Sequence, residues 1–215
     1  MKKNKSNIWL PIILTITSIV FIFLVKNVDV KAIGPKNSSV GFSSINGFFK
    51  DLLGSNMTIY KITEVLGVIA LLIVGIYGLI GIIQLIKRKS LFKVDKKIIA
   101  LGCLYVVVLG MYVLFEKVVI NYRPVLIDKV LEASFPSSHT MLAVCVCMSA
   151  IIMNKDYIKN KKYLKYTNIC IFILMILIVL GRFISGVHWF SDIVGGLLIS
   201  ATLLSYFDIA YRRLN

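Results

Sequence analysis

The chain has 215 residues, of which 58% are hydrophobic and 16% are charged, and its mean hydropathy is +0.87. This composition is too apolar for a water-soluble domain of that length, and it indicates an integral membrane protein. A formal charge of +15 could suggest nucleic acid as a partner, but the cations gather between apolar runs, so we expect no nucleic acid.

Six apolar stretches are long enough, or nearly so, to form transmembrane helices. In chain order they are Ile8–Val25, Leu66–Ile86, Ile98–Phe115, Thr140–Met153, Ile169–Leu180 with an extension toward Ile184, and Trp189–Ala210. The predicted fold class is all-α, an integral membrane six-helix bundle, and we treat residues 1–215 as a single membrane-embedded domain. A cleaved signal peptide is the alternative for the first run, because Val30-Lys31-Ala32 has the character of a cleavage site.

Residues 26–57, between the first two spans, carry an amphipathic pattern. Apolar side chains recur there at helical spacing with polar residues between them: Phe42, Ile45, Phe48, Phe49, Leu52 and Leu53. We expect a short extracytoplasmic helix on the membrane surface. It either covers the bundle or guides a lipid headgroup toward a site.

The fourth apolar stretch is unusually short. Its helical pattern begins at Ser138 or His139, and its apolar run ends at Met153. At ~1.5 Å per residue it covers only about two thirds of a ~30 Å hydrocarbon core. We therefore expect its N-terminus to be sunk below the outer surface, in a pocket walled by the other helices.

Cations mark one side of the predicted bundle. They precede the first span, fill the second and fourth connections and close the chain: Lys2, Lys3, Lys5; Lys87, Arg88, Lys89, Lys93, Lys96, Lys97; Lys155, Lys159, Lys161, Lys162, Lys165; Arg212 and Arg213. The positive-inside rule assigns these segments to the cytoplasm. Both termini are then cytoplasmic, and the remaining loops face the extracytoplasmic side of the cell membrane.

Three polar clusters lie in those remaining loops, within residues 117–192. They read Lys117-x5-Arg123-Pro124, Pro136-Ser137-Ser138-His139, and Arg182-x5-His188-x3-Asp192, and they contain both histidines of the chain. Three cations, two imidazoles and one carboxylate on one side of a membrane are suited to phosphoryl transfer.

The histidines have separate candidate roles. His188 and Asp192 are four residues apart and share a helix face, so the carboxylate can orient the imidazole and stabilise its cation. His188 is then a nucleophile toward phosphorus. His139 is the general acid that protonates the departing alkoxide and later the base that activates water.

The other polar residues of the clusters are candidate phosphate ligands. Arg123 and Arg182 can each bind two phosphate oxygens through the planar guanidinium, whereas Lys117 acts as a point charge. Ser137 offers a hydroxyl, and the backbone N–H groups of Ser138 and His139 begin a helix. Each also has a structural interpretation, as an interfacial cation or a helix cap.

On these residues the chain resembles the type-2 phosphatidic acid phosphatase family, integral-membrane relatives of the vanadium haloperoxidases. The family's motifs are Lys-x6-Arg-Pro, Pro-Ser-Gly-His and Ser-Arg-x5-His-x3-Asp, in that order. The resemblance implies phosphate binding by Lys117, Arg123, Ser137, Ser138 and Arg182. It further implies acid–base catalysis by His139, attack by His188 and orientation by Asp192, without metal or cofactor.

Three departures from the family's motifs stand out. Five residues rather than six separate Lys117 from Arg123, so the lysine could reach the site differently or be replaced by another cation. Ser138 stands where glycine is usual, and Gly181 stands where serine is usual.

The resemblance implies a membrane lipid phosphatase that hydrolyses a lipid phosphate monoester or diphosphate through a phosphohistidine. Phosphatidic acid, phosphatidylglycerol phosphate and undecaprenyl diphosphate represent the expected substrate class, and no obligate protein partner is inferred. The alternatives are a non-catalytic protein that binds or transports lipid phosphates, a metalloenzyme built on both histidines and Asp192, and a vanadate-dependent haloperoxidase. The four cysteines lie in apolar spans and suggest neither a disulfide nor a metal site.

Overall fold

The computed structural model describes residues 8–214 of the chain. Within that range the protein is all-helical and has no β-strand, only isolated bridges. Its elements are α1 (Trp9–Asn27), η1 (Pro35–Asn37), α2 (Ser43–Leu53), α3 (Met57–Arg88), η2 (Leu91–Lys93), α4 (Lys96–Lys117), α5 (Ser138–Tyr157), α6 (Lys161–Ile184) and α7 (Phe190–Arg213). All except α2 and the two short 3-10 helices are long and apolar enough to span a membrane. The predicted six-span bundle is confirmed, and the chain is a multi-pass membrane protein.

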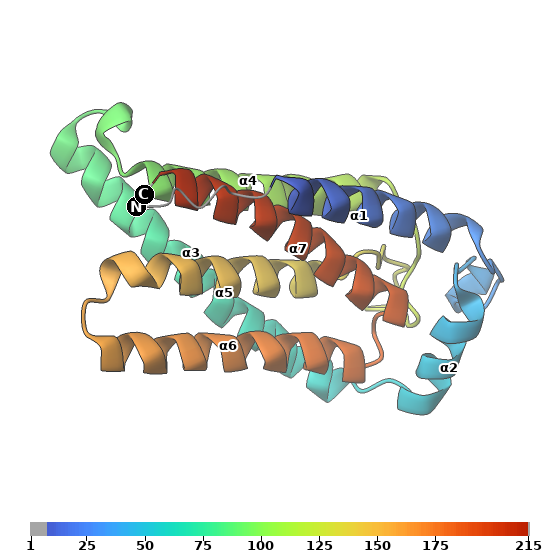
Figure 1. Cartoon of the computed structure of the whole chain (residues 1–215). Coiled ribbons are helices and arrows are strands. Elements are labelled where there is room, and N and C mark those ends of the chain that lie inside the picture. The colour runs from blue at the N-terminus through green and yellow to red at the C-terminus, as the bar shows by residue number, and fades with distance from the viewer. Residues whose placement is uncertain (1–7, 215) are drawn as a thin grey trace.

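Helix α5 is the centre of the bundle. It packs between α6 and α7 and also contacts α3 and α4, while α1 lies along α7 and α3 crosses the bundle obliquely (Figure 1). In its most apolar window 56% of the residues are buried, against 17% for each of α1, α3 and α6. The outer helices instead present apolar side chains such as Phe23, Leu72 and Val106 at the surface. Such a surface suits contact with lipid chains.

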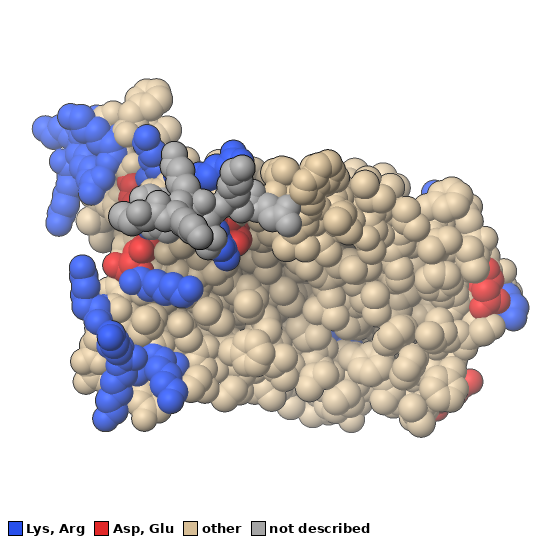
Figure 2. Space-filling model, viewed as in Figure 1, with Lys and Arg blue, Asp and Glu red and all other residues tan. Residues whose placement is uncertain are grey.

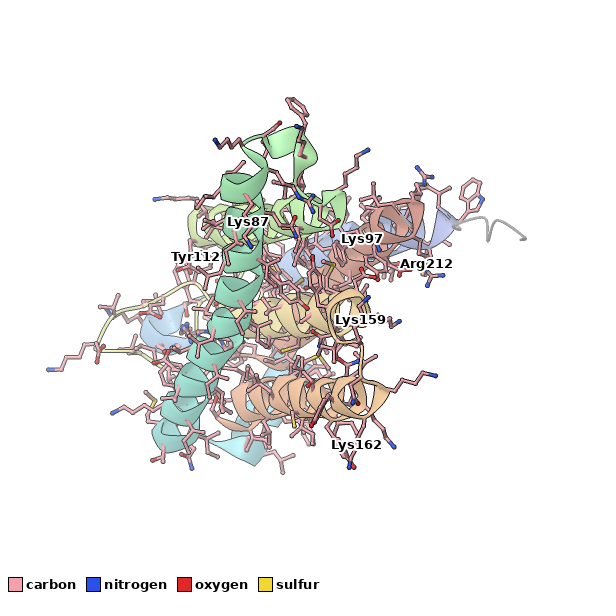
Figure 3. The ribbon with its side chains drawn as sticks, turned by 90° about the vertical axis from the view of Figure 1, so that its left-hand side faces the viewer. Lys87, Lys97, Tyr112, Lys159, Lys162 and Arg212 are labelled. Carbon is pink, nitrogen blue, oxygen red and sulfur yellow. The ribbon has the colours of Figure 1, made fainter. Side chains whose placement is uncertain are left out.

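Cations gather at one end of the bundle. In the face shown in Figure 2, Lys and Arg concentrate at the end where α3 finishes and α4 begins. Figure 3 looks onto this end and shows Lys87, Lys97, Lys159, Lys162 and Arg212 there, from four different parts of the chain. The loops that carry both histidines lie at the opposite end (Figure 1). Lys2, Lys3 and Lys5 lie outside the described residues, and the cytoplasmic assignment stays a prediction.

Several helix boundaries differ from the sequence prediction, and α6, for example, begins at Lys161, eight residues before the expected Ile169. Helix α5 has 20 residues, about 30 Å, so the prediction of a helix too short to cross is wrong. It continues past Met153 because buried Asn154 exchanges hydrogen bonds with Tyr77 and Asn168. Helix α3 begins at Met57, nine residues before the expected Leu66, because Asn56 caps it by accepting hydrogen bonds from two backbone N–H groups.

The amphipathic helix predicted between the first two spans is confirmed as α2, and its polar side faces inward. Asn46 is fully buried and bonds to the start of α7, accepting from the Ser191 backbone N–H at 3.0 Å and donating to the Ser191 hydroxyl at 2.9 Å. Phe49 stacks on Phe190 with 4.6 Å between ring centroids. Ile45, Phe48 and Leu52 are exposed. Helix α2 therefore braces the start of α7 and turns an apolar face outward.

Candidate active site

Small residues of α7 seat the loop that precedes α5. A Cβ atom on Gly195 would lie 2.5 Å from the Phe135 ring, and one on Gly196 would lie 3.1 Å from the Ser137 carbonyl oxygen. Larger side chains at these positions would push the loop away. This close approach fixes residues 134–137 against the start of α7.

The connection between α6 and α7 is a tight turn that needs glycine. Gly186 has a φ of +63°, and a Cβ atom there would lie 1.9 Å from the Gly54 carbonyl oxygen. The Asn56 backbone N–H donates to the Ser185 carbonyl at 2.9 Å, which ties the turn to the start of α3. The histidine that follows is therefore held on a rigid connection.

His188 has both ring nitrogens engaged in a buried setting. Its Nδ1 lies 3.1 Å from the Ser134 carbonyl oxygen, which can only accept, so Nδ1 carries the proton. Its Nε2 is then unprotonated and accepts a hydrogen bond from Nη1 of Arg123 at 3.4 Å. The side chain is 1% exposed. In this tautomer the unprotonated Nε2 of His188 lies next to the guanidinium of Arg123, a group that commonly binds phosphate.

The charge state of His188 favours the same arrangement. Burial, with the positive charges of Arg123 and Arg182 nearby, holds the pKa of His188 well below its usual range. The imidazole is therefore neutral at physiological pH, as a nitrogen nucleophile must be.

Asp192 lies beside His188 but does not provide the closest contact. Its Oδ2 is 3.6 Å from Nδ1 of His188, an ion-pair distance, and accepts a hydrogen bond from the Trp189 backbone N–H at 2.8 Å. The Asp192 carbonyl accepts from the Ser137 N–H at 3.0 Å. The carboxylate can thus stabilise an imidazolium and cap α7, while the Ser134 carbonyl fixes the tautomer. Being a backbone group, that carbonyl gave no signal in the sequence.

Arg123 forms one wall of a narrow pocket that also contains His188. Its Nε lies 2.9 Å from a Glu132 carboxylate oxygen, and its backbone N–H donates to the Glu132 carbonyl at 3.0 Å. The side chain is 10% exposed. The pocket lies between the end of α4 and the start of α5 and is lined also by Tyr112, Phe115, Glu116, Ala133, Ser134, Phe135, Pro136, Ser138 and Met141.

Arg182 is the most deeply buried cation of the site. Its side chain is fully buried, and none of its three guanidinium nitrogens has a hydrogen-bond partner. Nη2 lies 3.5 Å from Oε1 of Glu64, and the guanidinium stacks on the Tyr60 ring, 4.6 Å from its centroid. The Tyr60 ring also lies 6.0 Å from the guanidinium carbon of Arg123. A buried guanidinium with open donors is costly, and an anion would satisfy it.

His139 is the second residue of α5 and lies against α3. A Cβ atom on Gly67 would lie 3.1 Å from Cδ2 of His139, so glycine makes room for the ring. Nδ1 of His139 is buried without a hydrogen-bond partner. The ring lies against the α3 face that also carries Glu64, whose carboxylate is 3.5 Å from Arg182.

The two serines before His139 are placed differently. Ser137 is fully buried and caps α5, where its Oγ accepts from the Thr140 backbone N–H at 3.4 Å and its hydroxyl lies 3.0 Å from that of Thr140. Ser138 lines the pocket with His188 and Arg123. Since the first backbone N–H groups of a helix have no intrahelical acceptor, the start of α5 offers donors to an anion.

Lys117 is not brought into the cluster. It is the last residue of α4, and its side chain is exposed. The preceding residue, Glu116, lines the pocket instead. The structure therefore brings together His139, His188 and Asp192 with Arg123, Arg182, Ser137 and Ser138, and leaves Lys117 outside.

One wall of the cluster was missed from the sequence. It is the α3 face formed by residues at positions i, i+3, i+4 and i+7, namely Tyr60, Thr63, Glu64 and Gly67. Tyr60 and Glu64 contact Arg182, Thr63 contacts Gly181, and Gly67 contacts His139. The Asn56 cap and the 3.6-residue spacing were the available signals.

Thr63 accounts for the glycine at position 181. A Cβ atom there would lie 2.4 Å from Cγ2 of Thr63, so we expect Gly181→Ser to lower the free energy of unfolding by about 1–3 kcal/mol through overpacking. Adding Thr63→Ala should recover most of the loss. Thermal unfolding in detergent measures both effects. Gly78→Ser is the matched control, because nothing lies within 4 Å of that Cβ position. Equal losses at 181 and 78, or no recovery, would contradict this explanation.

Within residues 8–214, no three His, Cys, Asp or Glu side chains lie close enough together to hold a metal ion. The charge available to meet a phosphate in the cluster comes from Arg123 and Arg182, both largely buried. The cluster can therefore hold an anion on fixed guanidinium groups next to the unprotonated nitrogen of His188.

Comparison with known proteins gives two matches. The PAP2 superfamily matches residues 115–213. The fold is similar to the crystal structure of the first transmembrane PAP2 type phosphatidylglycerolphosphate phosphatase from Bacillus subtilis, with a TM-score of 0.63 over 94% of this chain and 95% of that chain, at 17% sequence identity. No curated protein matches the chain.

Proposed function

Because the PAP2 superfamily matches residues 115–213, we propose that the chain belongs to it and is a membrane lipid phosphatase that works through a phosphohistidine on His188. The observation that carries the proposal is the orientation of His188. Its Nδ1 is held by the Ser134 carbonyl, and its unprotonated Nε2 faces Arg123 inside a pocket. Few structural roles require a buried neutral histidine next to two buried arginines.

The proposed reaction has two steps. First, Nε2 of His188 attacks phosphorus, the bond between phosphorus and the lipid oxygen breaks, and His139 gives that oxygen a proton. Arg123 and Arg182 hold the phosphoryl oxygens, and the Asp192 carboxylate stabilises the His188 imidazolium. Second, His139 takes a proton from water, whose oxygen attacks phosphorus and releases His188 and inorganic phosphate. No metal ion takes part in this proposal.

The substrate class that we propose is a lipid phosphate monoester or diphosphate. The pocket lies between the end of α4 and the start of α5, in a bundle whose outer surface is apolar. Helix α2 lies at the same end of the bundle (Figure 1), and its Ile45, Phe48 and Leu52 side chains are exposed. A lipid can place its phosphate in such a site while its chains stay in the bilayer. The solved protein from Bacillus subtilis is, by name, a phosphatidylglycerolphosphate phosphatase, and the substrate in that name is a lipid phosphate monoester.

We further propose that the site faces the extracytoplasmic side. The cationic end of the bundle (Figures 2 and 3) lies opposite the α6–α7 connection and the loop before α5 (Figure 1), and the positive-inside rule assigns cationic ends to the cytoplasm. Cysteine labelling of single-cysteine variants in intact cells, with an impermeant reagent, tests the assignment at Asp128 in the site loop against Lys159 in the cationic end.

The function is tested by phosphate release from the purified protein in detergent. The panel contains phosphatidic acid, phosphatidylglycerol phosphate and undecaprenyl diphosphate, with a strong chelator present. We expect release from at least one member by the wild-type protein. Binding without release from any member would instead favour the non-catalytic alternative, and loss of activity in chelator would favour a metalloenzyme.

A further inference from the structure

Glu64 is a carboxylate inside a span, next to the proposed catalytic groups. It lies two turns into α3, which precedes the matched superfamily region, and its side chain is 45% exposed. Ionisable residues inside membrane spans are rare and commonly functional. Its Oε1 lies 3.5 Å from the buried Arg182 guanidinium. The mechanism above gives Glu64 no role.

The position of Glu64 on α3 also brings it close to His139. Gly67 follows Glu64 by three residues and therefore lies on the same face of α3. The Cβ position of Gly67 is 3.1 Å from the His139 ring, so the Glu64 carboxylate lies within about one helical turn of that imidazole.

His139 needs such a neighbour if it is to be a general acid. Three charged side chains gather where His139 meets α3: Glu64 of α3, Arg182 of α6, which lies 3.5 Å from Glu64, and Arg123, which shares the Tyr60 ring with Arg182. Among these three, Glu64 alone carries a negative charge. The two arginines oppose a proton on His139, and a nearby carboxylate favours it.

We propose, on the premise of the phosphatase function above, that Glu64 is a positioning residue that keeps His139 protonated for departure of the lipid alkoxide. In the first step the proton passes from His139 to the lipid oxygen, and Glu64 keeps its negative charge throughout. In the second step His139 regains a proton from water beside the same carboxylate. Glu64 thus acts through His139 and does not touch phosphorus.

The test compares leaving groups in the Glu64→Gln variant of the full chain in detergent. Farnesyl phosphate leaves as a basic alkoxide that needs a proton, whereas 4-nitrophenyl phosphate leaves as a weakly basic phenolate that does not. We expect kcat for farnesyl phosphate to fall about tenfold or more, and kcat for 4-nitrophenyl phosphate to fall less than about threefold. Glu64→Asp should restore part of the farnesyl phosphate rate, and exposed Asp51→Asn on α2 should change neither rate.

A double-mutant cycle gives a second and independent measurement. If Glu64 acts through His139, then Glu64→Gln should cause no further loss in a His139→Gln background, as measured by single-turnover cleavage of labelled farnesyl phosphate. This measurement does not depend on the comparison with 4-nitrophenyl phosphate.

Three outcomes would overturn the inference. Equal losses for both leaving groups would mean that Glu64 only supports Arg182. An unchanged farnesyl phosphate rate would mean that it has no role, and an undiminished loss in the His139→Gln background would mean that it acts elsewhere. In these cases the wild-type protein still releases phosphate, whereas failure of the proposed function itself shows as no release by the wild type from any substrate.

Discussion

Replacement of His188 by asparagine is expected to abolish phosphate release while leaving the fold intact. Asparagine can donate its side-chain N–H to the Ser134 carbonyl, as Nδ1 of His188 does at 3.1 Å, so the buried polar contact survives. It has no counterpart of the Nε2 lone pair that faces Arg123. Loss of a covalent nucleophile lowers kcat by about 10⁴-fold or more. Steady-state phosphate release from the preferred lipid measures the effect.

The covalent intermediate gives a direct measurement of the same step. His139→Gln should slow hydrolysis of the phosphohistidine, because no base activates the attacking water. With a ³²P-labelled substrate whose leaving group needs no proton, we expect alkali-stable and acid-labile label on the His139→Gln protein. The His188→Asn protein should carry none. Turnover by His188→Asn, or label that persists on it, would show that another residue is the nucleophile.

Hydropathy and chain order were sufficient to predict most of the fold. Six apolar stretches set the bundle, and a single span, an odd number of crossings, separates each cluster from the neighbouring cationic loop, which placed clusters and cations at opposite ends. This topological prediction needed no knowledge of side-chain packing. Because it put all three clusters on one side of the membrane, they could be assigned to one site although they lie far apart in the sequence.

The part of the site on α3 could not be found in that way. Lys61 and Glu64 interrupt the apolar pattern, so the span was predicted to begin only at Leu66. The first turns of α3 nevertheless form, because Asn56 caps them and their side chains pack on α6. Hydropathy measures transfer to lipid, whereas Tyr60 and Glu64 are stabilised by contacts with a buried arginine.

The placement of Lys117 follows from helix geometry. Each residue turns the side-chain direction by about 100° around an α-helix. Moving the lysine one position closer to Arg123 therefore rotates it away from the pocket, and position 116, at the usual spacing, carries glutamate. The sequence showed the altered spacing, but only coordinates show which α4 side chain faces the pocket.

Arg182 is expected to give the clearest separation of stability from activity. The fully buried guanidinium has no hydrogen-bond partner and a single ion-pair contact at 3.5 Å with Glu64, which is half exposed. Replacing a buried charge of this kind by an apolar side chain of similar volume is often neutral or stabilising. We therefore expect Arg182→Met to keep or raise the unfolding temperature in detergent.

The same substitution should remove most of the activity, because a fixed donor to the phosphoryl oxygens is worth about 10²–10³-fold in kcat. Inorganic vanadate or phosphate should raise the unfolding temperature of the wild-type protein but not that of Arg182→Met, since a ligand stabilises only the form that binds it. Arg182→Lys keeps the charge and loses the planar fork, so its activity should lie between those of the wild-type protein and Arg182→Met.

The matched control is Arg212→Met, which replaces an exposed arginine at the cationic end and should behave as wild type. If Arg182→Met instead unfolded at a much lower temperature and still bound vanadate, the arginine would be a structural element of the α3–α6 contact and the phosphate would have to be held by Arg123 and the start of α5.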